Sequence, residues 1–256
     1  MIKEIESQKE NVIILDAGSS LSGHYDTEYS KGEIMIQFMN LLGYDAMTMG
    51  IFDLKYDDDQ LLKLSNQAEF PFLSANFISK QGKNTFFKPY EIINTSKRNI
   101  AVIGISPFPL LEENVESEII KKYETIDPII AIKNIIDEVR WKANIIIVLS
   151  AAGREIDEKI AKSIDYVDII VSGSSNAATL EPIVIGREGK SNALIVESMV
   201  LGKRIGKLIV EFNSVGKIKG FEGELINLNE EVEDDFEIVN ILNEYLEEVG
   251  EERQSQ

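Results

Sequence analysis

The sequence predicts a layered α/β domain. Short apolar runs typical of strands alternate along the chain with amphipathic helices, and glycine or small polar residues follow the ends of several runs. Late in the chain, GKLIVEFNSVGKIKGFEGELINL alternates apolar and polar residues and turns at SVG, which is typical of an antiparallel hairpin. Together these patterns favour sheets covered by helices, with antiparallel pairs near the C-terminal end.

The individual elements follow from the same patterns. Strands are expected at 12–15, 46–49, 72–75, 89–93, 100–105, 145–149, 167–171, 193–197, 207–213 and 217–228. Helices are expected at 31–42, 57–68, 127–141 and 155–163, and in the tail. Gly43 is suited to end the first of these helices, and Asp127 with Pro128 to begin the third. In the helix at 57–68, we expect Leu61, Leu62 and Leu64 to face the core.

Composition excludes several classes of protein. The chain has 256 residues, which is enough for a substantial core, and its net charge of −18 argues against nucleic acid or an anionic membrane as a partner. There is no cysteine, so thiolate chemistry and disulfides are excluded. No secretory signal and no membrane-spanning run is visible, so the chain as written is expected to be cytoplasmic.

The C-terminal segment is strongly acidic. Residues 230–256 contain eleven acidic residues and one base, Arg253, so they supply −10 of the net charge. A solvated terminal helix and a docking tail for a basic partner both fit this composition. We expect residues 1–228 to form one domain and residues 229–256 to form an acidic helix or tail.

The order of the strand-end loops resembles that of a known family. LDAGSSLSG, GYDAMTMGIFD, FPFLSANF, KPYEI, IAVIGIS, IIIVLSAAG and DIIVSGSSNAATLEP follow one another as their counterparts do in the 5'-nucleotidase branch of the calcineurin-like metallophosphoesterases. The resemblance runs from about Val12 to about Leu228. It implies two facing mixed sheets flanked by helices, a four-layer sandwich. It also implies two divalent metals that activate a water for attack on a phosphoester.

The motifs that carry this chemistry in the family are replaced here. The family's Asp-x-His strand would precede Val12, so the first strand and its ligands are apparently missing. Where the family has the bridging aspartate of Gly-Asp, this chain has Ser19, and Gly-Asn-His-Glu becomes Gly50 followed by Ile51, Phe52 and Asp53. The family's Ser-His and Gly-His-x-His become Ser150-Ala151 and a loop with Ser174 and Asn176. The resemblance therefore implies a lost metal site. Ile51 and Phe52 are expected to bury apolar area in its floor.

A few polar residues could retain a binding role. Asp16 could hold a cation or cap loop amides, and Asp53 could cap the turn in which it lies. His24, the single histidine, fits a surface loop better than a ligand set. Asn76 is expected to tie loops together, and Ser150 lacks the neighbouring base that a serine nucleophile needs.

Three hypotheses remain open from the sequence. The first is a pseudoenzyme without metals or cofactors that has a binding, regulatory or structural role. The second is a residual metal-dependent phosphoesterase that uses Asp16, Asp53, His24 or Asn76. The third is a sensor that binds a phosphate-like or uncharged small molecule in the former cleft. A sheet without its first strand would expose an edge, so a homodimer or a protein partner is also expected.

Overall fold

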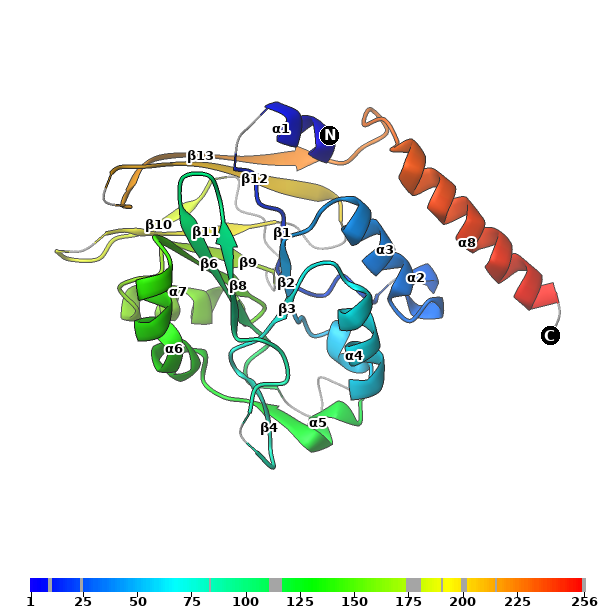
Figure 1. The fold of residues 1–256 in the computed structure, drawn as a ribbon, viewed down its shortest axis with the longest axis horizontal. Coiled ribbons are helices and arrows are strands. Elements are labelled where there is room, and N and C mark those ends of the chain that lie inside the picture. Colours follow the sequence, from blue (N-terminus) through cyan, green and yellow to red (C-terminus); the bar gives the residue numbers. More distant parts are fainter. Residues whose placement is uncertain are drawn as a thin grey trace.

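Two sheets face each other in the computed structural model. The structure describes residues 1–8, 11–23, 25–82, 84–110, 117–173, 181–189, 191–198, 202–214 and 216–254. Within these residues, the larger sheet has the order β10-β11-β9-β8-β6-β5 and the smaller one β1-β2-β3 (Figure 1). The six strands are β5 (Tyr90–Asn94), β6 (Asn99–Ile105), β8 (Ile145–Ser150), β9 (Ile169–Ser172), β10 (Ile183–Ile185) and β11 (Ala193–Glu197). The three strands of the smaller sheet are β1 (Leu15–Asp16), β2 (Ala46–Thr48) and β3 (Phe72–Leu73).

The larger sheet is mixed, and the smaller one is parallel in its described strands. β6, β8, β9 and β11 run parallel, and the outer strands β5 and β10 are antiparallel to their neighbours. Side chains alternate between the two faces of each strand. Ile145 and Ile147 of β8 therefore face the smaller sheet, whereas Ile146 and Val148 belong to the cluster that packs against helices.

Helices cover the outer faces. α6 (Pro128–Lys142) and α7 (Arg154–Ser163) cover the larger sheet, and α3 (Glu33–Leu41) and α4 (Asp58–Gln67) cover the smaller one (Figure 1). Asp127 begins α6 as expected, because its carboxylate accepts hydrogen bonds from the Ile129 and Ile130 amides. The layers thus run helix, sheet, sheet, helix, the predicted four-layer sandwich.

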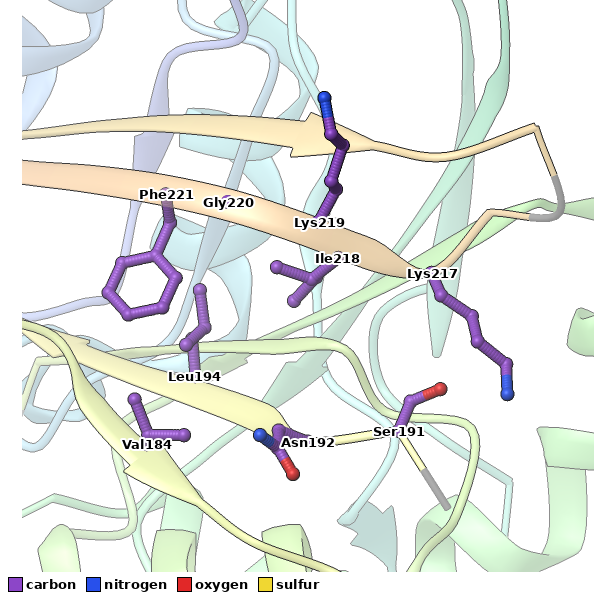
Figure 2. Close-up of a pocket in the computed structure, with 9 residues that line it drawn as sticks. All are labelled: Val184, Ser191, Asn192, Leu194, Lys217, Ile218, Lys219, Gly220 and Phe221. Carbon is purple, nitrogen blue, oxygen red and sulfur yellow. The ribbon is translucent and has the colours of Figure 1, made fainter.

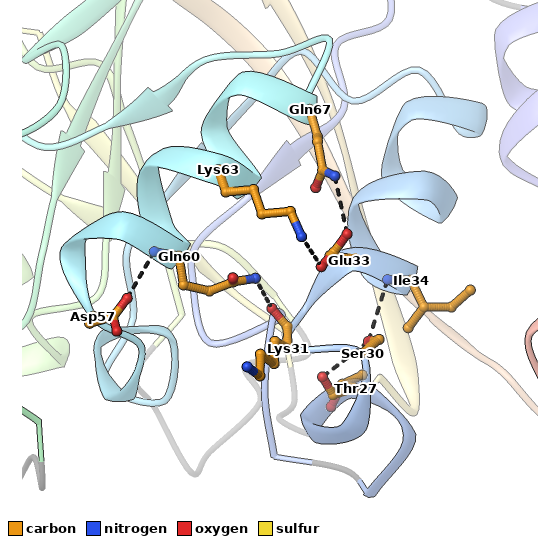
Figure 3. Close-up of polar contacts among 9 residues, drawn as sticks. All are labelled: Thr27, Ser30, Lys31, Glu33, Ile34, Asp57, Gln60, Lys63 and Gln67. Carbon is orange, nitrogen blue, oxygen red and sulfur yellow. Dashed lines mark hydrogen bonds and ion pairs between the residues drawn. The ribbon is translucent and has the colours of Figure 1, made fainter. Parts of the chain in front are cut away.

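Polar contacts tie α3 to α4. The Glu33 carboxylate accepts hydrogen bonds from Lys63 and Gln67, and Gln60 donates to the Lys31 carbonyl (Figure 3). Asp57 begins α4 through a hydrogen bond from the Gln60 amide. These contacts fix the helix pair that covers β1, β2 and β3. Gly43 follows α3 at φ 67°, as expected of a residue that ends a helix.

The late hairpin and the tail complete the fold. β12 (Arg204–Phe212) pairs antiparallel with β13 (Ile218–Asn227), and their apolar side chains pack against the cluster between the sheets. The acidic tail forms α8 (Phe236–Gln254), which contacts α3 and extends along the outside of the molecule (Figure 1). None of the described helices is both long and apolar enough to cross a membrane.

Several details differ from the sequence predictions. Leu62 is 45% exposed, so its expected inward position is wrong. Its side chain lies about 100° around the helix from that of the buried Leu61 and therefore points away from the core. The edge position of β1 agrees with the expectation of a sheet without its first strand, and the described residues before Val12 contain the helix α1 (Ile2–Gln8). Short elements that the sequence patterns did not reveal are α1, α2 (Tyr25–Tyr29), the 3₁₀ helix η1 (Asp53–Lys55), β4 (Phe77–Ser79), α5 (Ile119–Lys122), β7 (Tyr123–Thr125) and β10.

Candidate functional site at the strand ends

The loop after β1 and the loop after β2 touch through two glycines. A Cβ placed on Gly18 would lie 2.5 Å from the Gly50 backbone nitrogen, and one on Gly50 would lie 2.1 Å from the Ser19 Oγ. Gly18 also has φ 96°, in the left-handed region that favours glycine. The sequence therefore brings Ser19 directly against the residues that follow β2. These two loops form the centre of the candidate site.

Asp53 is buried between these loops and binds their amides. Its Oδ2 accepts hydrogen bonds from the Ser19 amide at 2.7 Å and the Gly50 amide at 2.8 Å, and its Oδ1 accepts one from the Leu21 amide at 2.9 Å. The side chain is fully buried, and burial raises the pKa of Asp53 to about 7 although the amides favour the charged form. The expected capping contact is present, and the same carboxylate also holds the neighbouring loop.

Asp16 is also engaged by its own loop. Its Oδ1 accepts a hydrogen bond from the Gly18 amide at 2.8 Å, and its Oδ2 accepts one from the Ser20 hydroxyl at 2.5 Å. Burial raises the pKa of Asp16, partly opposed by these two hydrogen bonds. Both carboxylates at the centre of the site therefore already hold loop groups.

The two apolar residues after Gly50 lie in different environments. Ile51 is half-buried against the aromatic core beneath the smaller sheet. Phe52 is 56% exposed, so the expectation that both side chains are buried in the floor is wrong for Phe52. Phe52 precedes η1, whose turn buries Asp53 and Leu54 instead. The benzyl ring of Phe52 is therefore exposed at the surface of the site, which its apolar character alone did not indicate.

Asn76 joins the ends of three strands. Its side-chain amide donates to the Ser106 carbonyl, its Oδ1 accepts from the Ser106 amide, and its own carbonyl accepts from the Ile126 amide. Ser74 adds a hydroxyl contact to Ser106 at 2.8 Å. All three side chains, Asn76, Ser74 and Ser106, are fully buried, so this network fixes loops as expected for Asn76.

The ends of β8 and β9 present small side chains. Ala151 is buried, and the fully buried Ser150 accepts a hydrogen bond from the Ala152 amide. A Cβ placed on Gly173 would lie 2.2 Å from the Ala17 carbonyl oxygen, so the larger sheet here touches the loop after β1. His24, Ser174 and Asn176 lie outside the described residues.

A second group of polar residues was not found from the sequence. Ser172, Glu197 and Asp157 are buried near Ser150, and Arg154 pairs with Glu197. Their sequence neighbours are ordinary strand and helix residues. The sheet register aligns Ser150, Ser172 and Glu197, and the first turn of α7 adds Arg154 and Asp157. This group lies on the face of the larger sheet that α7 covers.

A separate hollow lies away from the strand ends. It has a volume of about 350 Å³ between β13 and the start of β11, at the opposite end of β11 from Glu197 (Figure 2). Val184, Leu194, Ile218 and Phe221 face its interior, while Lys219 points away (Figure 2). Among the described residues that line it, Ser191 and Lys217 carry a hydroxyl and an amine but none is acidic or a histidine, so we do not treat it as a candidate catalytic site.

The described residues do not fit a pair of divalent metals. Such a pair needs several oxygen and imidazole ligands, and backbone N–H groups already point at both oxygens of Asp53. The side chains of Ala151 and Phe52 are hydrocarbon and have no atom that could ligate a metal ion. In the described part of the chain, no group of three or more His, Asp or Glu side chains could hold a metal ion.

Comparison with known proteins agrees with this fold. A 5'-nucleotidase precursor from Thermus thermophilus matches with a TM-score of 0.86 at 24% identity, over 97% of this chain and 52% of that one. The calcineurin-like phosphoesterase YfkN from Bacillus subtilis matches with a TM-score of 0.79 at 22% identity, over 96% of this chain and 86% of that one. The protein therefore has the fold of the calcineurin-like metallophosphoesterases.

Sequence comparison finds relatives among the 5'-nucleotidases. A snake venom 5'-nucleotidase from Gloydius brevicauda is 28% identical over 269 residues, which covers 93% of this chain and 43% of the venom protein. The homologues of this chain are 5'-nucleotidases, so the resemblance seen in the strand-end loops is confirmed. No family model matches the chain. The chain spans less than half the length of the curated relatives it matches.

Proposed function

We propose that the protein is a pseudoenzyme, a metallophosphoesterase fold that does not hydrolyse phosphoesters and serves a binding or regulatory role. The observation that carries this proposal is the use of Asp53. Three loop amides occupy its carboxylate, and the neighbouring Asp16 is engaged in the same way. A cation could reach these oxygens only by displacing hydrogen bonds that hold the loops together.

A turnover assay tests the loss of hydrolysis. The protein would be incubated with nucleoside monophosphates and an aryl phosphate in Mg²⁺, Mn²⁺, Co²⁺ or Zn²⁺, beside an active 5'-nucleotidase as positive control. We expect no release of phosphate above the metal-free reaction. Saturable hydrolysis that disappears in Asp16→Asn would establish the residual phosphoesterase instead.

Phe52 supports a binding role for the same surface. An exposed aromatic ring beside two polar loops provides an apolar contact for a ring or an uncharged molecule, and the loop amides provide polar contacts. The occupant that fits this combination is a small phosphate-like or uncharged molecule.

A thermal-shift experiment tests the binding role. Adenosine, adenosine monophosphate and inorganic phosphate would serve as probes. At least one is expected to raise the unfolding midpoint of the wild type and not that of Phe52→Ala. Trp141→Ala is the matched control, because Trp141 is 81% exposed on α6. No shift with any probe, or equal shifts in both variants, would contradict a binding role for this surface.

A further inference from the structure

Three buried polar residues lie side by side at the carboxyl ends of adjacent parallel strands. Ser150 ends β8, Ser172 ends β9 and Glu197 ends β11. The register pairs Ser150 with Ser172, and Ser172 with Glu197. Each residue is two positions beyond a member of the core cluster under α6 and α7, so all three side chains point toward α7.

Asp157 enters the same cluster from the first turn of α7. It is fully buried, and within the described part of the chain neither of its carboxylate oxygens has a hydrogen-bond partner. Ser172 is 1% exposed, and its hydroxyl also has no hydrogen-bond partner there. Burial raises the pKa of Asp157 to about 6, while the Ser150 and Ser172 hydroxyls lie close enough to lower it. A buried carboxylate without a partner is costly.

The charges in this cluster do not balance. Arg154 forms a two-point contact with Glu197, from its Nε to Oε1 at 3.1 Å and from its Nη2 to Oε2. The guanidinium is therefore committed to Glu197, whose side chain is fully buried. Asp157 adds a second negative charge beside this pair, and Arg154 offsets it only at a distance. One positive charge would neutralise the cluster.

We propose that this cluster binds one alkali cation, sodium or potassium, between α7 and the larger sheet. The Asp157 carboxylate and the Ser150 and Ser172 hydroxyls supply the oxygen ligands that hard cations prefer. A single charge matches the single uncompensated carboxylate. The bound ion would fasten the start of α7 to the ends of β8 and β9, and it would do so whether or not the strand-end site hydrolyses phosphoesters.

Cation-dependent stability tests the site. The unfolding midpoint of the full chain would be measured at pH 8 in sodium, potassium or choline chloride at constant ionic strength, since choline is too large to enter. We expect a saturable rise with sodium or with potassium, and the salt that saturates first identifies the preferred ion. Equal midpoints in all three salts would overturn the proposal.

Matched variants assign the effect to the cluster. Asp157→Asn is expected to abolish the difference between alkali and choline salts, and Ser172→Ala to raise the half-saturating concentration roughly tenfold. Asp168→Asn removes a half-buried carboxylate that has a partner of its own in the Ile146 amide, and this variant should keep the full response. If Asp157→Asn does not fold, the alkali response of Ser172→Ala decides whether the cluster is the binding site. An alkali response unchanged in Ser172→Ala, or lost in Asp168→Asn, would place the ion elsewhere and overturn the proposal.

Discussion

At the scale of single residues, Asp53 shows how a carboxylate in the candidate site stabilises the fold. Its carboxylate joins the loops after β1 and β2 through three amides, and it is fully buried. A capping contact between Asp53 and the turn after Gly50 was predicted from the sequence. The contacts to Ser19 and Leu21 were not, because a residue string does not show that two loops about 30 residues apart meet.

Removing this carboxylate tests its structural role. Asp53→Ala leaves three amides, two buried and one part-buried, without their acceptor, so the free energy of unfolding is expected to fall by about 2–4 kcal/mol. Urea denaturation measures the change. Asp59→Ala, an exposed acid on the neighbouring helix α4, is the control and should change stability by less than about 0.5 kcal/mol. A loss at Asp53 no larger than that of the control would contradict this role.

Asp168 makes stability depend on pH. Burial raises its folded-state pKa to about 6, above the ordinary value of the unfolded chain, so its contribution is complete at low pH and is lost as the pH rises through 6. The stability advantage of the wild type over Asp168→Asn should therefore shrink between pH 4 and 6, by at most roughly 1.4 kcal/mol per pH unit. Denaturation of both proteins across this range measures it, and a constant difference would contradict the raised pKa.

At the scale of elements, glycines set how closely the strand-end loops approach. A Cβ on Gly173 would lie 2.2 Å from the Ala17 carbonyl oxygen, and one on Gly104 would lie 2.2 Å from the Leu73 carbonyl oxygen. Both glycines belong to the larger sheet or its loops, and both partners belong to the smaller sheet or its loop. The two sheets therefore meet backbone to backbone at these points.

Adding a single methyl group at Gly173 tests this close contact between the sheets. Gly173→Ala must move the loop after β1 or the end of β9, so the free energy of unfolding should fall by more than about 2 kcal/mol. Gly186→Ala is the matched control, because nothing lies within 4 Å of its added Cβ. Thermal or urea unfolding of the two variants gives the comparison. If Gly173→Ala were as stable as Gly186→Ala, the close approach would not constrain the sheets.

The long elements were predictable, and the short ones were not. The apolar run at 145–149 became β8 and the helix at 127–141 became α6, because each has enough residues to show its period. β1 and β3 have two residues each, too few for a period, and each covers only part of its predicted run. The cluster of Ser150, Ser172, Glu197 and Asp157 depends on sheet register and on the packing of α7 against the sheet, which no local pattern encodes.

At the scale of the whole molecule, the edge strand β1 of the smaller sheet is available for pairing with a second chain. β1 lies at the edge of the smaller sheet, and no described strand pairs with its outer side. Because an unpaired edge invites pairing with another chain, we propose a homodimer. Light scattering should then give twice the 28.7 kDa of the chain. A mass of one chain across the concentration range would remove this proposal.

The proposed loss of metals and of hydrolysis can be tested by metal analysis of the native protein. The protein would be dialysed against Mn²⁺ and Zn²⁺ and freed of unbound ions before the measurement. An active 5'-nucleotidase treated in the same way is the control. Substoichiometric transition metal would agree with the hydrogen bonds that occupy Asp16 and Asp53. Two tightly bound transition-metal ions per chain would overturn the pseudoenzyme proposal.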